Sequence, residues 1–301
     1  MYIENRRPAF LVLAAVLPLL ASCAPADGAK PSALAVADDT GRTVSLPAPA
    51  RRVFSVIPSL TESVTALDHE VLVARTRFDR APELAHLPSL GDAIRPNLEA
   101  LVRLEPDLVI SWDDPDQRTF ADQVAALGIP VYRANVQTIA DVRSHLRRLG
   151  VLLGRGERAG ALVDSLDQAL ARVAASVRGR DRVAVYYSVW HDPPQTTGPG
   201  TFIDEVIEYA GGRNVFGDAS NAWPLVSLEA ILQRSPEVLV IARHSEDRPA
   251  APWLDGPGWR ELEAVRTRRY LLVEGDLFNR PGPRVAEAAR RLARFLHFER
   301  E

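Results

Sequence analysis

The sequence predicts an α/β protein built from two similar lobes that a long helix connects. The first observation is an internal repeat: residues 98–110 (LEALVRLEPDLVI) and residues 228–240 (LEAILQRSPEVLV) share Leu, Glu, Ala and Pro in register. Each copy reads as a short helix, a Pro-marked turn and an apolar strand, so the two copies indicate two related lobes. The second observation is that strand and helix patterns alternate in both halves, which favours mostly parallel sheets. The third is the segment between the halves, residues 138–177, which shows no strand signal.

The N-terminal lobe is expected to span residues 34–137. It begins with a strand, a turn and a strand within residues 36–46. Apolar runs then predict four strands of a sheet, and Ser59 or Thr61 can cap the helix that follows the first of them. These strands are expected at residues 53–57, 71–74, 108–112 and 129–132.

The connecting segment, residues 138–177, has apolar residues at helical spacing throughout. Gly154 and Gly156 interrupt the pattern after its first third. From Glu157 onward one helix of about 20 residues, roughly 30 Å long, is expected. A helix of this length between two lobes would be a rigid spacer.

The C-terminal lobe is expected to span residues 178–301 and again alternates strand with helix. Its predicted elements are a strand at 183–187, a helix at 201–210, the second copy of the repeat, strands at 238–242 and 270–273, and a closing helix at 283–297.

The N-terminus reads as a targeting segment. Arg6 and Arg7 precede an apolar run, residues 9–20, that is too short to span a membrane comfortably. The run ends in Leu-Ala-Ser-Cys, which resembles the bacterial lipobox, so residues 1–22 are predicted to be a lipoprotein signal peptide and Cys23 the lipidated residue. The alternative is an ordinary signal peptide followed by an incidental thiol. On the lipoprotein interpretation, residues 23–33 are the lipidated Cys and a flexible tether.

Composition and motifs exclude several classes of function. The formal charge of −3 argues against a nucleic-acid partner. No Gly-x-Ser-x-Gly elbow or Walker loop is present, residues 154–156 lie in a helical region, and residues 196–200 read as a turn. The six His show no close ligand spacing, so no metal site built from His is expected. We therefore expect no catalytic residue and no cofactor.

Large rings follow several predicted strands. In open α/β sheets, ligands bind beyond the carboxyl ends of the strands. Phe78 and Trp112 stand at such places in the first lobe, and Trp190 and Trp223 in the second. Packing into the core is the alternative for each ring, but their number on loops of both lobes favours a cleft for a bulky, partly planar ligand.

Three charged residues near the last predicted strand are candidates for polar contacts to that ligand. Asp276, Arg280 and Arg284 can hold polar edges through charge-assisted hydrogen bonds. Their alternative role is a surface ion pair or a helix cap.

Taken together, the chain resembles the class III substrate-binding proteins of bacterial ABC importers, which serve cobalamin, haem and ferric siderophores. The likeness runs from about residue 35 to residue 297 and is strongest toward the cobalamin-binding members. The segments that carry it are residues 57–62, 97–110, 210–216, 223–229 and 279–284. The resemblance implies two Rossmann-like lobes bridged by one long helix, with the ligand held between them.

The resemblance also implies a role for the repeated Glu. In the family, one acidic residue on each lobe docks onto Arg residues of the two transmembrane subunits, and Glu99 and Glu229 match those positions. The alternative is that each Glu only favours the positive end of its helix, with Asn97 and Ser227 as caps.

Five residues match positions that contact the ligand in the cobalamin-binding members. Phe78 stands where a Tyr is usual and lacks its hydroxyl, and Gln195 stands where a ring is common, with Trp190 nearby. The matching residues are Phe78, Trp112, Trp223, Asp276 and Arg280.

Two other ligands stay open within the same family. Haem would need an axial ligand, for which Tyr186, Tyr187 and His191 are the nearby candidates. A siderophore would need several convergent Arg residues.

The sequence thus predicts a solute-binding protein, anchored through Cys23 in the periplasm or at the cell surface. It would capture a corrinoid by a small closure of the lobes and deliver it to the transmembrane subunits of an ABC importer. The protein is expected to be a monomer that touches the membrane only through its anchor. The rival from another class is an extracytoplasmic enzyme or metal-handling protein on the same two lobes.

Overall fold

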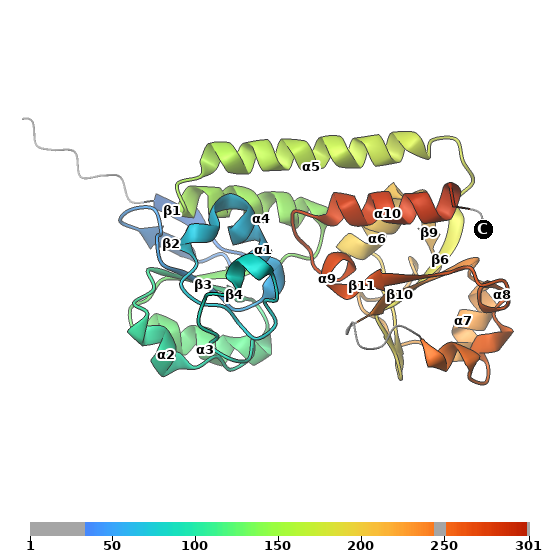
Figure 1. Cartoon of the computed structure of the whole chain (residues 1–301), viewed down its shortest axis with the longest axis horizontal. Coiled ribbons are helices and arrows are strands. Elements are labelled where there is room, and N and C mark those ends of the chain that lie inside the picture. Colours follow the sequence, from blue (N-terminus) through green and yellow to red (C-terminus); the bar gives the residue numbers. More distant parts are fainter. Residues whose placement is uncertain (1–33, 244–250, 300–301) are drawn as a thin grey trace, which may run out of the picture. The chain divides into compact units, whose positions relative to one another are not determined.

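The computed structural model describes residues 34–243 and 251–299 (Figure 1). The predicted signal peptide, the lipidated Cys23 and the tether lie outside the described residues. Among the helices within the described ranges, none combines the length and the apolar character needed to cross a membrane.

The first sheet is parallel, with strand order β3-β4-β5. An antiparallel hairpin of two short strands precedes it in the chain and pairs Leu34 with Leu46. We use "N-terminal lobe" for the elements from β1 to β5. Their bounds are β1 Leu34–Ala37, β2 Thr43–Leu46, β3 Val53–Ser55, α1 Pro58–Asp68, η1 His69–Val71, η2 Pro82–Leu84, α2 Leu98–Arg103, β4 Leu108–Trp112, α3 Pro115–Ala126 and β5 Val131–Ala134.

One predicted strand of this lobe is wrong. Residues 71–74 were expected to form a strand, but the structure has the end of a 3-10 turn there and a single bridge from Leu72 to Val53. The run is apolar because Val71, Leu72 and Ala74 are buried, and it pairs with β3 at one place only before the chain turns away. The segment thus has the apolar pattern of a strand because it is buried, although it forms no hydrogen-bonded ladder with a neighbouring strand.

The connecting segment contains two helices, α4 (Ile139–Leu152) and α5 (Gly156–Ser176). Thr138 and Asp141 form a capping box at the start of α4. Gly154 lies in the turn between the two helices. Its φ is +63°, and a Cβ there would lie 2.9 Å from Pro49. With 21 residues, α5 is about 30 Å long. The expected long helix is confirmed, and it starts at the predicted break.

The second sheet is also parallel, with strand order β11-β10-β6-β9. We use "C-terminal lobe" for the elements from β6 onward. The short hairpin β7–β8 and strand β9 were not predicted, because two or three residues carry too little periodicity. The bounds are β6 Val183–Ser188, β7 Trp190–His191, β8 Pro194–Gln195, α6 Phe202–Tyr209, β9 Gly212–Asn214, α7 Leu228–Arg234, β10 Val238–Arg243, η3 Pro252–Asp255, η4 Trp259–Glu261, α8 Glu263–Arg266, β11 Tyr270–Glu274, α9 Gly275–Phe278 and α10 Val285–His297.

The sequence repeat is also a structural repeat. Helix α2 leads into β4 and helix α7 leads into β10, each through one residue in the left-handed region. These residues are Glu105 with a φ of +44° and Ser235 with a φ of +46°, and a Pro follows each of them. The residue before Pro is disfavoured in the right-handed helical region, so neither helix continues past this position, although α2 ends one residue earlier in the repeat than α7.

The acid after each of these Pro residues joins two neighbouring strands. The Asp107 carboxylate accepts hydrogen bonds from the backbone N–H groups of Arg51 at 2.8 Å and Arg52 at 3.0 Å, just before β3. The Glu237 carboxylate accepts one from Ala184 of β6 at 2.9 Å. In both lobes the acid therefore satisfies a backbone donor at the start of the adjacent parallel strand.

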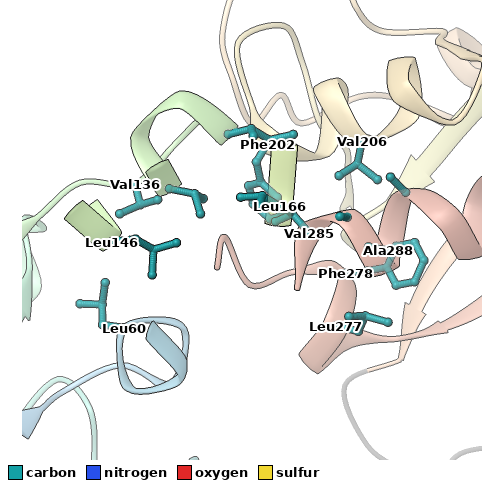
Figure 2. Packing of buried hydrophobic residues seen from close by; sticks show 14 of the residues in the cluster. Leu60, Val136, Leu146, Leu166, Phe202, Val206, Leu277, Phe278, Val285 and Ala288 are labelled. Carbon is teal, nitrogen blue, oxygen red and sulfur yellow. The ribbon is translucent and has the colours of Figure 1, made fainter. Parts of the chain in front are cut away.

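A single apolar cluster runs from the N-terminal lobe through the connecting helices into the C-terminal lobe. Leu60 of α1, Leu146 of α4, Leu166 of α5 and Phe202 of α6 all belong to it (Figure 2). Smaller clusters cover the opposite faces of the two sheets. Because the large cluster is shared, the connecting helices are packed against both lobes, which limits the motion between them.

Candidate functional site

A cavity of about 730 Å³ is lined by residues of both lobes. In the N-terminal lobe, one side of α1 and the segment 79–84 line it, as does Leu162 of the connecting helix α5. In the C-terminal lobe, the ends of β10 and β11, helix α9 and the turn before α10 line it. Its volume falls in the range typical of small-molecule sites.

The cavity lies where the strand-end rule places a ligand. Arg243 is the last residue of β10 and Glu274 the last of β11, and both line it. Helix α9 starts directly after β11 at Gly275, where a Cβ would lie only 2.5 Å from the Arg243 carbonyl oxygen. The close approach of these two strand ends therefore requires a glycine.

Arg280 is at the centre of the charged network at the cavity. Its Nη1 lies 2.8 Å from Oε1 of Glu62, which belongs to the other lobe, and its Nη2 lies 2.7 Å from Oδ1 of Asp276. Nη2 of Arg284 lies 3.3 Å from the same Glu62 oxygen and donates to the Asp276 carbonyl at 3.2 Å. The three polar residues singled out from the sequence are thus brought together, and Glu62 is the common partner of Arg280 and Arg284.

The cavity carries nearly balanced charge, with four Arg and five acidic side chains in its lining. They are Arg80, Arg243, Arg280 and Arg284, and Glu62, Asp79, Glu83, Glu274 and Asp276. The lining therefore offers both hydrogen-bond donors and acceptors rather than one sign of charge.

Two polar atoms of the lining are buried without a hydrogen-bond partner among the described residues. They are Nε of Arg243 and the Thr65 hydroxyl. Buried polar groups are normally satisfied, so these two atoms are exceptions to the usual pattern.

The two rings predicted in the N-terminal lobe do not line the cavity, and only Trp112 stands at a strand end. Phe78 is 38% exposed, and the Arg77 guanidinium lies over its ring at 4.8 Å from the centroid. Trp112 ends β4, is half-buried, and packs against the shared apolar cluster.

The two rings predicted in the C-terminal lobe do not line the cavity either. Trp190 stands on the β7–β8 hairpin, is 47% exposed, and donates from Nε1 to the Asp192 carbonyl at 2.8 Å. Trp223 is half-buried and packs against the shared cluster, as Trp112 does. The strand-end rule predicts the edge of the sheet, but the path of each loop decides where its ring points.

The three side chains considered as haem ligands also lie outside the cavity lining. Tyr186 and Tyr187 are buried, and the Tyr187 hydroxyl donates to Oδ1 of Asn279 at 2.7 Å. Burial raises the pKa of both phenols. The His191 ring stacks on Trp253, with centroids 5.2 Å apart and planes 7° from parallel.

Glu99 and Glu229 are exposed and occupy the second position of α2 and α7. Oδ1 of Asn97 accepts the N–H of Ala100 at 2.9 Å, and Oγ of Ser227 accepts that of Ala230 at 3.2 Å. The caps expected from the sequence are therefore present. The pKa of Glu229 is lowered by its own backbone N–H and then by the Ser227 hydroxyl.

Sequence reasoning missed Glu62, Arg80 and Arg243 as site residues. Arg243 follows the predicted strand 238–242 directly, so the strand-end rule was sufficient to find it. Glu62 had no comparable signal, because its partner Arg280 is far away in the sequence. In the part of the chain that the structure describes, no group of three or more His, Cys, Asp or Glu side chains could hold a metal ion.

Two parallel α/β lobes, a long connecting helix and a cavity lined from both lobes define a class of bilobed binding protein. The chain belongs to the periplasmic binding protein family, whose model matches residues 53–275. It is thus an extracytoplasmic binding protein of an ABC importer, of the class III type, and its relatives are binding proteins rather than enzymes. Such proteins deliver small ligands to transmembrane permease subunits.

Similar proteins cover most of the chain. The vitamin B12-binding protein of Vibrio parahaemolyticus is 27% identical over 244 residues, which is 80% of this chain and 87% of that protein. The crystal structure of the periplasmic vitamin B12-binding protein of Vibrio cholerae aligns with a TM-score of 0.70 at 25% identity, covering 82% of this chain and 97% of that one. A possible iron-binding periplasmic protein of Staphylococcus epidermidis aligns with a TM-score of 0.73 at 26% identity, covering 83% and 100%.

Proposed function

We propose that the protein captures a corrinoid between its two lobes and delivers it to the permease of an ABC importer. The observation that carries the ligand class is the nearly balanced charge of the cavity lining. A corrinoid bears many side-chain amides, each of which both donates and accepts hydrogen bonds. Arg280, paired with Glu62 and Asp276, offers donors and acceptors side by side to such amides. The names of the vitamin B12-binding relatives support the same ligand class.

A ferric siderophore is the second candidate, favoured by the four Arg side chains in the lining. An anionic ligand gains from convergent guanidinium groups, but here Arg280 and Arg284 already face carboxylates. Haem is disfavoured, because Tyr186 and Tyr187 are buried and the His191 ring is stacked on Trp253.

Isothermal titration of the purified protein tests the ligand class directly. Cyanocobalamin, cobinamide and a ferric hydroxamate are titrated separately, and binding of at least one corrinoid at micromolar concentration or below is expected. Absence of heat and of fluorescence quenching with both corrinoids at tens of micromolar would remove the corrinoid proposal. Heat with the ferric hydroxamate alone would establish the second candidate instead.

Two substitutions connect the ligand to the cavity. Asp276→Asn removes one charge of the pair while keeping the side-chain size, and Arg280→Gln removes the other charge with a shorter side chain. Each is expected to weaken corrinoid binding about tenfold, since a charge-assisted hydrogen bond is lost. Asp218→Asn is the matched control, because Asp218 pairs with Arg234 elsewhere in the same lobe.

We further propose that Cys23 carries a lipid that tethers the protein to a membrane. The basic start, the short apolar run and the Leu-Ala-Ser-Cys sequence support this. Cell fractionation of the wild type and a Cys23→Ser variant tests it, with release of the variant into the soluble fraction expected. Equal distribution of both proteins would contradict the anchor.

A further inference from the structure

The C-terminal lobe is joined to the preceding part of the chain by polar contacts at two separate places. The first lies beside the connecting helices, where the Phe202 N–H donates to the Gln137 carbonyl at 2.6 Å and the Ile139 N–H donates to Oε2 of Glu205 at 2.5 Å. The second lies at the cavity, where Glu62 meets Arg280 and Arg284. Among the ion pairs of the described ranges, only those of Glu62 join the N-terminal lobe to the C-terminal lobe.

The second tie is well placed to resist screening by solvent. The Glu62 side chain is 21% exposed and that of Arg280 is 18% exposed. The turn that carries Arg280 also runs close to α1: a Cβ on Gly282 would lie 3.6 Å from the Ser59 carbonyl oxygen. Salt and solvent screen a pair this shielded less than they screen a fully exposed pair.

The geometry points to Glu62 as a positioning residue, which fastens the two lobes at the cavity and fixes Arg280 for the ligand. One carboxylate oxygen receives both guanidinium groups, so its loss would release both at once. Arg280 would then keep only Asp276, whose side chain is 60% exposed and lies in the same lobe. Nothing would remain at this place to hold the lobes at their present spacing except contacts of the turn with α1.

A consequence for binding follows from linkage. If the Glu62 contact favours the spacing that the ligand requires, ligand binding and the contact must strengthen each other by the same factor. This part of the inference rests on the proposed corrinoid function, whereas the fastening of the lobes does not.

Distance measurements between spin labels test the fastening without any ligand. The labels are attached to the full-length protein through Gln123→Cys on α3 and Gln233→Cys on α7, which are exposed and lie in different lobes, in a Cys23→Ser background. The Glu62→Gln variant keeps the size of the side chain and removes its charge. We expect a broader label-to-label distance distribution in this variant than in the wild type.

Glu70→Gln is the matched control, because Glu70 is an exposed acid of the same lobe that does not line the cavity and has no ion pair among the described residues. It is expected to leave the distance distribution unchanged. Urea unfolding of both variants checks that they are folded. A distribution for Glu62→Gln as narrow as that of the wild type would overturn the inference.

Titration with cyanocobalamin and cobinamide tests the positioning of Arg280. Glu62→Gln is expected to weaken binding about tenfold, as the loss of a charge-assisted contact predicts, and Glu70→Gln is expected to change it less than twofold. Equal affinities for the two variants would overturn the positioning role. If the wild type binds neither corrinoid, the proposed function fails, and the distance measurement alone then decides whether Glu62 fastens the lobes.

Discussion

Glu99 and Glu229 occupy equivalent positions in two related helices, one in each lobe. Each is the second residue of a helix whose N-cap side chain accepts the N–H of the residue after the Glu. Each helix also leads through a left-handed residue and a Pro into a buried parallel strand. The repeat thus presents two exposed carboxylates on matching scaffolds.

Removing these two charges is expected to impair delivery of the ligand but not its capture. Glu99→Gln and Glu229→Gln together should lower uptake of radiolabelled cyanocobalamin by complemented cells roughly tenfold, since both contacts to the permease would be weakened. Corrinoid affinity of the purified variant should stay at the wild-type value. Glu157→Gln is the matched control, because Glu157 is exposed at the second position of α5. Normal uptake by the double variant would rule out docking through these residues.

We predict that the Trp190 ring covers one face of a corrinoid that extends beyond the cavity lining. The residue is 47% exposed and its Nε1 donates to the Asp192 carbonyl, so Trp190→Ala should lower the free energy of unfolding by only about 1 kcal/mol. A ring that covers a corrinoid face buries a large area, so the same change should weaken binding about tenfold by titration. Phe298→Ala serves as the control, since Phe298 is 51% exposed after α10. An unchanged affinity for Trp190→Ala would remove this residue from the site.

His145 is expected to make the protein less stable as the pH falls. Burial, and then the nearby Arg148 charge, lower the pKa of His145 from 6.5 to about 3 in the folded state. At a pH between these two pKa values, His145 is protonated in the unfolded chain and neutral in the folded protein. The free energy of unfolding should therefore fall as the pH decreases from about 6.5 towards 3, by up to about 1.4 kcal/mol per pH unit.

Replacing this imidazole with a ring that does not titrate isolates its contribution. Both ring nitrogens lack a hydrogen-bond partner among the described residues, and the ring lies 5.7 Å from that of Tyr132. His145→Phe should flatten the pH dependence of urea unfolding between pH 6 and pH 4. Identical slopes for the variant and the wild type would contradict a neutral, buried His145.

The cap at the start of α4 is expected to have a measurable effect on stability. The Thr138 hydroxyl accepts the Asp141 N–H at 3.1 Å, and Oδ2 of Asp141 accepts the Thr138 N–H at 2.9 Å. Thr138→Ala removes the cap and should lower the free energy of unfolding by about 1 kcal/mol. Thr138→Ser keeps the hydroxyl and should lose less than half of that amount. Equal losses in both variants would mean that the methyl group, not the cap, is what stabilises the helix.

Much of the fold was predictable because it depends on local pattern. The strand at 108–112 matches β4, the break at residues 154–156 separates α4 from α5, and the repeat appears twice in three dimensions. Periodicity, Pro and Gly act over a few residues, so they can be read without knowing the partners. Residues 71–74 failed as a strand for the converse reason, since a ladder needs a neighbour that local sequence does not specify.

The candidate site was predictable only in part. The strand-end rule led to Asp276, Arg280 and Arg284, which do meet at the cavity. It did not reveal that Trp112 and Trp223 pack against the shared apolar cluster. A ring at the end of a strand has the same sequence pattern whether it packs into the core or lines a cleft.

The sequence alone determined the alternation of strand and helix, the two related halves and the matching placement of Glu99 and Glu229. These follow from spacing and capping, which act within a few residues of each other. Only the tertiary structure decided that Glu62 and Arg280 face each other, 2.8 Å apart, at a cavity lined from both lobes. That contact joins residues far apart in the chain, and their separation in space is set by the packing of both lobes on the connecting helices.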